Sequence, residues 1–279
     1  MHAALEGFLA QVWNGRTNIP NDPKDAAKHI YNTWYAVRPS ASNPVSNFDN
    51  RIRSMVANLP GVKLEVQGKD EFFHVNPSDW RSGESVKKMQ FRVYLNPKGD
   101  DEVLKVFEAV VKQFVVIQVG RTNLGRPIKA KVAGAKSLGR LDSIVVYTPD
   151  EQTAKTVARA TSGSFAANKE TPAMTLPVGP SGVSIGAEPP AVTIFGDLHQ
   201  DPKKNLQSFG NIRCEIIAVA LKETLGKKNP TDINLPSFKK ITADYLTVVG
   251  IDPDNPGRQK NKDNLETIWK AAMTAKQRR

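Results

Sequence analysis

The residues with the clearest chemical potential in this sequence are polar side chains on two predicted strands, 91–96 and 128–133. Side chains alternate between the two faces of a strand, so each segment has one apolar face and one polar face. If both apolar faces lie on a core, the polar faces form a basic surface that can hold a phosphate, and one of its lysines could act as a base. The polar side chains are Arg92, Tyr94 and Asn96 on the first strand and Lys129 and Lys131 on the second.

A glycine-bounded loop, Gly134–Gly139, follows the second strand and contains Lys136. A nucleotide-binding P-loop has Lys and then Ser or Thr after its last glycine, whereas Arg140 and Leu141 stand there in this sequence, which argues against a P-loop. A turn of this kind can still present backbone N–H groups to an anion. The alternative is an ordinary hairpin loop between two strands.

A second candidate for anion binding lies at the start of a predicted helix, 208–225, which Ser208 can cap. A helix N-terminus with Arg213 on its first turns is suited to phosphate. Alternatively, Arg213 pairs with Glu215 or another surface acid. Elsewhere, His74 follows two phenylalanines and is a candidate catalytic group because it can approach the sheet surface.

The composition favours an anionic partner, since the net charge is +11 and the sequence pI is about 9.6. Nucleic acid, an acidic membrane surface and a phosphorylated peptide all fit that charge, and a solvated basic face fits it too. Cys214 is the single cysteine, so no internal disulfide or cysteine zinc site is expected. No apolar run reaches about 18 residues, and no secretory signal begins the sequence. A type III secretion signal cannot be recognised in this way.

The order of predicted elements indicates an α+β fold. We expect a helical N-terminal segment, 1–60, and an α+β domain, 61–279, with a further helical segment at its C-terminal end. The domain contains the order β-α-β-β-α-β, typical of a split βαβ, ferredoxin-like arrangement with a mixed or antiparallel sheet and helices packed on one face. The predicted strands are 62–66, 72–75, 89–96, 128–133, 143–148 and 182–186, and the predicted helices are 3–14, 24–36, 47–58, 101–115, 150–162, 208–225, 236–246 and 262–276.

Short blocks between about residues 70 and 258 share their order and spacing with a known family. They are Phe72-Phe73 and the segments 92–96, 130–134, 142–147, 171–174, 182–188, 208–213 and 252–256. In these blocks the sequence resembles the HopA family of type III secreted effectors and the HopA-like lyase proteins of class V lanthipeptide and thioamitide biosynthesis.

The resemblance implies one of two functions. The effector branch is delivered into plant cells. The biosynthetic branch works with a separate kinase, which phosphorylates Ser or Thr in a precursor peptide, and the HopA-like protein then eliminates phosphate to leave a dehydroamino acid. This sequence has no kinase signature, which fits a stand-alone lyase. The site positions that the resemblance carries over are Arg92, Lys131, Asp142, Ser208 and Arg213.

Phosphothreonine lyases of the other known type use a Lys-x-His strand element. Here Phe72 stands two residues before His74, so that element is absent.

The expected reaction is a cofactor-independent and metal-independent elimination of phosphate from phosphoserine or phosphothreonine. Lys131 is the expected base, because positive charge from Lys129 and Arg92 on the same face disfavours a protonated lysine. The remaining roles are phosphate binding for Arg92, Arg213, Lys136 and Ser208, proton donation for Tyr94 or His74, and orientation of Arg92 or Lys131 for Asp142.

Two other classes of function stay open. One is an effector-like protein that binds a host or peptide partner without catalysis, and the other is a nucleic-acid binder, which the charge alone suggests and no RNA-recognition motif supports. For the lyase we expect a phosphorylated precursor peptide and a separate kinase as partners, no membrane and no nucleic acid. Its expected location is the cytoplasm, and for the effector-like alternative it is a host cell reached by type III secretion.

Overall fold

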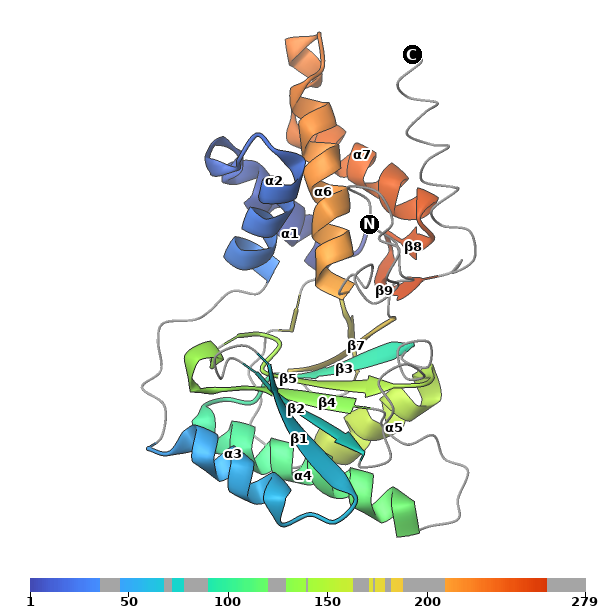
Figure 1. The fold of residues 1–279 in the computed structure, drawn as a ribbon. Helices are drawn as coiled ribbons and strands as arrows, with labels where there is room; N and C mark the ends of the chain where they lie inside the picture. The colour runs from blue at the N-terminus through green and yellow to red at the C-terminus, as the bar shows by residue number, and fades with distance from the viewer. Residues whose placement is uncertain are drawn as a thin grey trace, which may run out of the picture. The chain divides into compact units, whose positions relative to one another are not determined.

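A computed structural model of the protein describes residues 1–35, 46–67, 72–77, 90–119, 129–138, 140–162, 171–172, 174–178, 182–187 and 209–259. The chain separates into two compact units, of which one contains residues 1–35 and 188–279 and the other contains residues 36–187 (Figure 1). None of the described helices combines the length and the apolar character that crossing a membrane requires.

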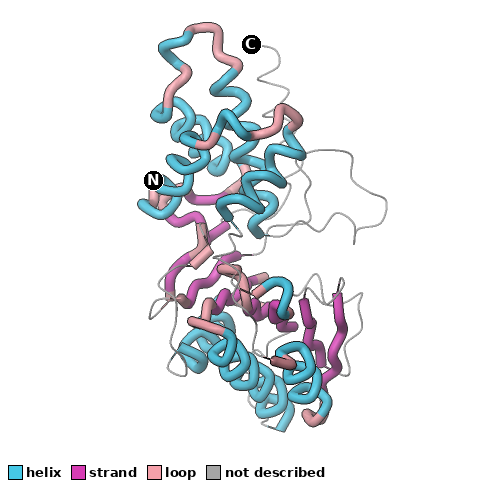
Figure 2. Tube along the Cα trace, turned by 90° about the vertical axis from the view of Figure 1, so that its left-hand side faces the viewer, coloured by secondary structure: helices cyan, strands magenta, loops and turns pink. Residues whose placement is uncertain are grey.

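The first unit is mainly helical, as the tube in Figure 2 shows. Helix α6 is apolar on most of its surface and packs against α2 and α7. Its neighbour α2 begins after Asp22, whose Oδ1 accepts a hydrogen bond from the N–H of Lys24 at 2.8 Å. The elements are α1 (Ala3–Asn14), α2 (Pro23–Ile30), the π-helical turn η2 (Tyr31–Tyr35), α6 (Phe209–Leu225), α7 (Leu235–Val248), β8 (Ile251–Asp252) and β9 (Asn255–Gln259).

One predicted helix of this unit, 24–36, has a different form in the structure. The α-helix ends at Ile30, and the wider turn η2 follows it. This turn stacks the rings of Tyr31 and Tyr35, whose centroids are 5.2 Å apart, against α6 at Gly210. A π-helical turn re-aims side chains in this way, and sequence periodicity does not reveal it.

The second unit is built on a seven-stranded sheet within its described residues, in the order β1-β2-β4-β5-β3-β7-β6, and all neighbouring strands are antiparallel. The strands are β1 (Val62–Gln67), β2 (Phe72–Pro77), β3 (Phe91–Leu95), β4 (Lys129–Ala133), β5 (Ile144–Thr148), β6 (Leu176–Pro177) and β7 (Val183–Ala187). The helices are α3 (Phe48–Ala57), α4 (Asp100–Val119) and α5 (Glu151–Ser162).

The predicted split βαβ order is confirmed. Helix α4 connects β3 to β4, and β5 lies between those two strands in the sheet. Helix α5 likewise connects β5 to β7, with β3 between them. The four strands therefore have the ferredoxin-like arrangement, to which the β1–β2 hairpin is added at one edge and β6 at the other. This interleaving brings β4, β5 and β3, which carry the candidate site residues, next to one another.

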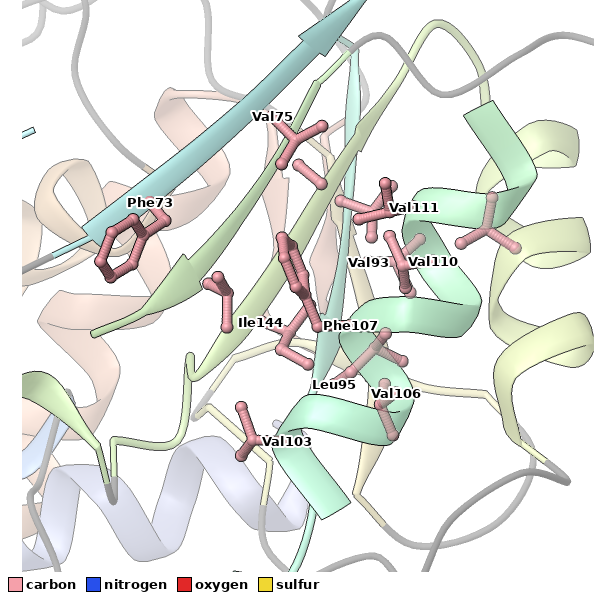
Figure 3. Close-up of a cluster of buried hydrophobic side chains, with 14 of the residues drawn as sticks. Phe73, Val75, Val93, Leu95, Val103, Val106, Phe107, Val110, Val111 and Ile144 are labelled. Carbon is pink, nitrogen blue, oxygen red and sulfur yellow. The ribbon is translucent and has the colours of Figure 1, made fainter. Parts of the chain in front are cut away.

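The core lies between one face of this sheet and the helices α3, α4 and α5, which gather on that face (Figures 1 and 2). Figure 3 shows Phe107 of α4 directed at Leu95 and Ile144 of the sheet. Alternating strand residues supply the apolar face, so their neighbours in sequence must lie on the other face. The α+β class and helices on one face are thus confirmed.

Most predicted elements agree with the structure to within a few residues. Helix α3, which the sequence places in the helical segment 1–60, supplies Phe48, Ile52 and Val56 to the core of the second unit. The predicted C-terminal helix 262–276 lies outside the described residues.

Candidate active site

The strand register arranges the polar face of the sheet in parallel rows. In the first, named the charged row, Lys129 of β4 is opposite Tyr147 of β5, and Tyr147 is opposite Arg92 of β3. Neighbouring strands are about 4.8 Å apart, so side chains in one row are close neighbours. The register therefore brings a lysine, a phenol and a guanidinium together from three separate stretches of sequence.

The next row, named the lysine row, contains three predicted site residues. His74 of β2 is opposite Lys131 of β4, and Val145 of β5 separates Lys131 from Tyr94 of β3. Tyr94 is buried. A third row contains Phe72, which is opposite Gln67 of β1 and Ala133 of β4. Lys131 therefore lies between the charged row on one side and Phe72 on the other.

A buried carboxylate holds Lys131 and a second cation, Arg140. Oδ2 of Asp142 lies 3.3 Å from Nζ of Lys131, and the guanidinium of Arg140 donates through Nε to Oδ1 at 2.7 Å and through Nη2 to Oδ2 at 3.2 Å. Burial alone would raise the pKa of Asp142, but Lys131 and Arg140 outweigh it and hold that pKa well below its usual range. Asp142 is therefore a carboxylate that orients the two cations.

The ring of Phe72 covers the same cations. Nζ of Lys131 lies 4.2 Å from the ring centroid, and Cζ of Arg140 lies 5.2 Å from it, both within the range of cation–π contacts. Lys131 is thus in contact with an apolar surface as well as with the carboxylate of Asp142.

The charged row changes the acidity of its own members. Burial lowers the pKa of Lys129, and the cations Lys131 and Arg92 lower it further, against opposing effects of Tyr147 and Glu65. Burial alone would raise the pKa of Tyr147, but the cations Arg92, Lys131 and Lys129 outweigh burial and lower it. Cζ of Arg92 lies 4.8 Å from the centroid of the Tyr147 ring. Lys129 thus loses its proton more readily than a free lysine, and Tyr147 is a stronger acid than a free phenol.

His74 is held in its neutral form. Burial lowers its pKa to about 3, and the charges of Lys129 and Lys131 contribute. Its Nδ1 has no hydrogen-bond partner among the described residues. At neutral pH it therefore carries no charge, so any proton that it donates must come from a neutral imidazole.

Lys136 lies beyond the sheet, exposed on the short turn η4 (Ala135–Ser137) between β4 and β5. The two strands are antiparallel neighbours, so the loop that contains Lys136 joins a hairpin. The backbone N–H of Ala135 donates to Oδ1 of Asp49 in α3 at 2.8 Å. This N–H of the predicted anion-binding turn therefore already donates to a carboxylate of the second unit.

Arg213 lies in the first unit and is fully buried. Its Nε and Nη2 donate to the carbonyl oxygen of Pro256 at 3.1 and 2.8 Å, and its Nη1 donates to that of Phe209 at 3.2 Å. These bonds attach β9 to the start of α6. Ser208, the predicted helix cap and phosphate contact, lies outside the described residues.

Sequence reasoning named Lys129 only as a source of charge and missed the contacts of Phe72, Arg140 and Tyr147. Tyr147 could have been found from the strand pattern, because it alternates with Val146 and so shares a face with Val145. Within the described part of the chain no group of three or more His, Cys, Asp or Glu side chains is placed to hold a metal ion. The absence of a metal and of a cofactor stays a prediction.

Comparisons with known proteins identify the family. No curated protein matches the chain. Two solved structures are similar at low TM-score: the type III effector and phosphothreonine lyase OspF of Shigella flexneri (11% identity, TM-score 0.36, covering 65% of this chain and 90% of that one) and the phosphothreonine lyase SpvC, an effector protein from Salmonella (13% identity, TM-score 0.35, covering 76% and 98%). The model of the HopA1 effector protein family matches residues 67–258, most of the sequence. The chain therefore belongs to the HopA1 effector protein family.

Proposed function

We propose that the protein is a phosphoserine/phosphothreonine lyase, which eliminates phosphate from a phosphorylated peptide and leaves a dehydroamino acid. The observation that carries this proposal is the register of β4, β5 and β3, which aligns Lys129, Tyr147 and Arg92 one row away from Lys131. A phosphate on the charged row would place the carbon atoms that bear it beside a lysine.

Phosphate binding is the first step. Arg92 presents a planar guanidinium that suits two oxygens of a phosphate, and Lys129 adds a point charge from two strands away. Burial strengthens their attraction for an anion relative to exposed side chains. Arg213 and Ser208 remain proposed phosphate contacts from the sequence, although the bonds of Arg213 to two carbonyl oxygens favour a structural role.

Proton removal is the second step, and we assign it to Lys131. Once Lys131 has released its own proton to solvent, its amine takes the Cα proton, the C–H electrons form the Cα=Cβ double bond, and the Cβ–O bond breaks with its electrons passing to the phosphate oxygen. Asp142, 3.3 Å from Nζ of Lys131, stabilises the ammonium that results. Lys129 is the second candidate base, since its pKa is lowered.

The departing oxygen can accept a proton from a neighbouring acid. Tyr94 and His74 are the donors that the sequence suggested, and Tyr147 is a third candidate because the cations around it lower its pKa. Arg92 and Lys129 offset the charge that collects on the phosphate.

The proposed biological setting is ribosomal peptide natural-product biosynthesis in the cytoplasm. A separate kinase would phosphorylate the precursor peptide, because this sequence has no kinase signature. A second candidate function is favoured by the family name: an effector delivered through a type III system that binds a host or peptide partner without catalysis.

The test is incubation with a synthetic phosphothreonine peptide and mass spectrometry of the product. We expect the wild-type protein to give a peptide lighter by phosphoric acid, and Lys131→Ala to lower the rate by at least about 10²-fold. Lys112→Ala is the matched control, because Lys112 is exposed on α4 and pairs with Glu108. Unchanged turnover in Lys131→Ala refutes the assignment of the base. A wild-type protein that binds the peptide without releasing phosphate refutes the lyase and favours the effector alternative.

A further inference from the structure

We infer that Phe72 makes the protein prefer phosphothreonine to phosphoserine, because its ring contacts the side-chain methyl group that only threonine carries. This inference rests on the proposed lyase function and names the residue that chooses between its two substrates. Phe72 is half-buried on β2, on the same face of the sheet as His74 and Lys131.

The position of the reacting carbon follows from the base. A lysine that removes the Cα proton must lie about 3–3.5 Å from the Cα atom in a reactive complex. The threonine methyl group is two bonds from Cα, and the ring centroid of Phe72 is 4.2 Å from Nζ of Lys131. A methyl group directed towards Phe72 can therefore reach van der Waals contact with the ring.

The direction of the methyl group follows from the rows. Lys131 lies between the charged row, which attracts the phosphate, and the row that contains Phe72. The phosphate oxygen and the methyl group are bonded to the same tetrahedral Cβ atom, so they leave it in different directions. With the phosphate at Arg92 and Lys129, the methyl group is on the side of Phe72.

Two apolar side chains on this face flank Lys131: Val145, which is opposite it on β5 and fully buried, and Phe72, which is half-buried and so is the one that a substrate can reach. Asp142 and Arg140 are charged, and His74 is polar. Burial of one methyl group in an apolar pocket discriminates between substrates by roughly tenfold or more in kcat/KM. A phosphoserine substrate has no methyl group to contact the ring. The protein would therefore bind the transition state for phosphoserine more weakly than that for phosphothreonine.

The experiment is a competition in one tube between a phosphothreonine peptide and a phosphoserine peptide of otherwise identical sequence. The ratio of the two dehydrated products gives the ratio of kcat/KM values and does not depend on the fraction of active protein. We expect the wild-type protein to favour phosphothreonine roughly tenfold. Phe72→Ala should bring the ratio close to one, and Phe72→Leu, which keeps an apolar side chain of similar length, should retain most of the preference.

Each result decides the inference. If Phe72→Ala slows both peptides equally and keeps the wild-type ratio, Phe72 acts only by positioning Lys131, and the inference is overturned. A wild-type ratio near one overturns it as well. Loss of phosphate from neither peptide with the wild-type protein refutes the lyase function itself, and the inference with it. Should Phe72→Ala not fold, Phe72→Val removes the ring while keeping a side chain that strands favour, and the same ratio is expected to fall.

Discussion

Three cations on one sheet face lower the pKa values of the titratable side chains beside them. Lys129, Lys131 and Arg92 together make Tyr147 more acidic, and two of them help to keep His74 neutral. They repel further positive charge and stabilise negative charge, which is the property that a phosphate requires. The effect on His74 has a consequence for stability that can be measured without any substrate.

His74 should make the second unit lose stability in mild acid. The folded protein keeps His74 neutral down to about pH 3, whereas in the unfolded chain this histidine takes up a proton below its ordinary value of 6.5. As the pH falls from 6.5, the unfolded state binds more protons, so the free energy of unfolding decreases by up to about 1.4 kcal/mol per pH unit. Urea unfolding at pH 7 and pH 5 should show a loss of about 2 kcal/mol in the wild-type protein.

His74→Gln should remove most of that pH dependence, because glutamine does not titrate in this range. His29→Gln, the same substitution in the first unit, is the control and should keep the wild-type difference between the two pH values. A His74→Gln variant with the wild-type difference would show that His74 is protonated in the folded protein, and the neutral imidazole described above would be wrong.

At the scale of elements, the contact of α6 with η2 depends on Gly210. A Cβ atom added there would lie on the rings of Tyr31 and Tyr35, 2.7 Å from Cε2 of Tyr31. We expect Gly210→Ala to lower the free energy of unfolding by about 1–3 kcal/mol, although alanine is the better helix former. Thermal or urea unfolding measures the change.

Gly7→Ala in α1 is the matched control, because a Cβ atom at Gly7 meets nothing within 4 Å. Only helix propensity then acts, and it should stabilise the protein by up to about 1 kcal/mol. Stabilisation by both substitutions would show that the rings of Tyr31 and Tyr35 do not pack against α6 as described.

The elements differ in how well the sequence predicts them, for identifiable reasons. The strand 91–95 alternates apolar and polar side chains, so both its existence and its faces follow from the period. The π-helical turn η2 cannot be predicted in this way, since Tyr31, Trp34 and Tyr35 fit an α-helical spacing equally well. The order of the four strands β4-β5-β3-β7 also follows from the β-α-β-β-α-β sequence of elements, whereas the places of β1, β2 and β6 do not.

Side-chain partners within the site were beyond sequence reasoning. Asp142 was expected to orient Arg92 or Lys131, and its contact with Lys131 is present, but the bidentate bond from Arg140 depends on how the β4–β5 hairpin closes. The alternation of a strand says which face a residue occupies, and only the register says which residue lies opposite. Tyr147 and Arg92 are far apart in the sequence and became neighbours through that register.

On the scale of the whole molecule, the chain with its net charge of +11 divides into two compact units. The second unit has its own core and contains Lys129, Lys131, Arg92 and Asp142. The first unit contains Arg213, whose guanidinium donates hydrogen bonds to the carbonyl oxygens of Pro256 and Phe209 in the same unit. The elimination chemistry proposed here therefore depends mainly on one continuous stretch of the chain.

A protein of residues 36–187 alone should fold, because this stretch contains every described strand of the large sheet together with the helices that cover it. We expect cooperative thermal unfolding and protection of the strand amides from hydrogen exchange. We also expect it to release phosphate from a phosphothreonine peptide, because Arg92, Lys131 and Asp142 all lie within it. The same stretch with Lys131→Ala is the control and should be inactive. A folded but inactive stretch would place an essential group in residues 1–35 or 188–279, and it would restore the case for Arg213 as a phosphate contact.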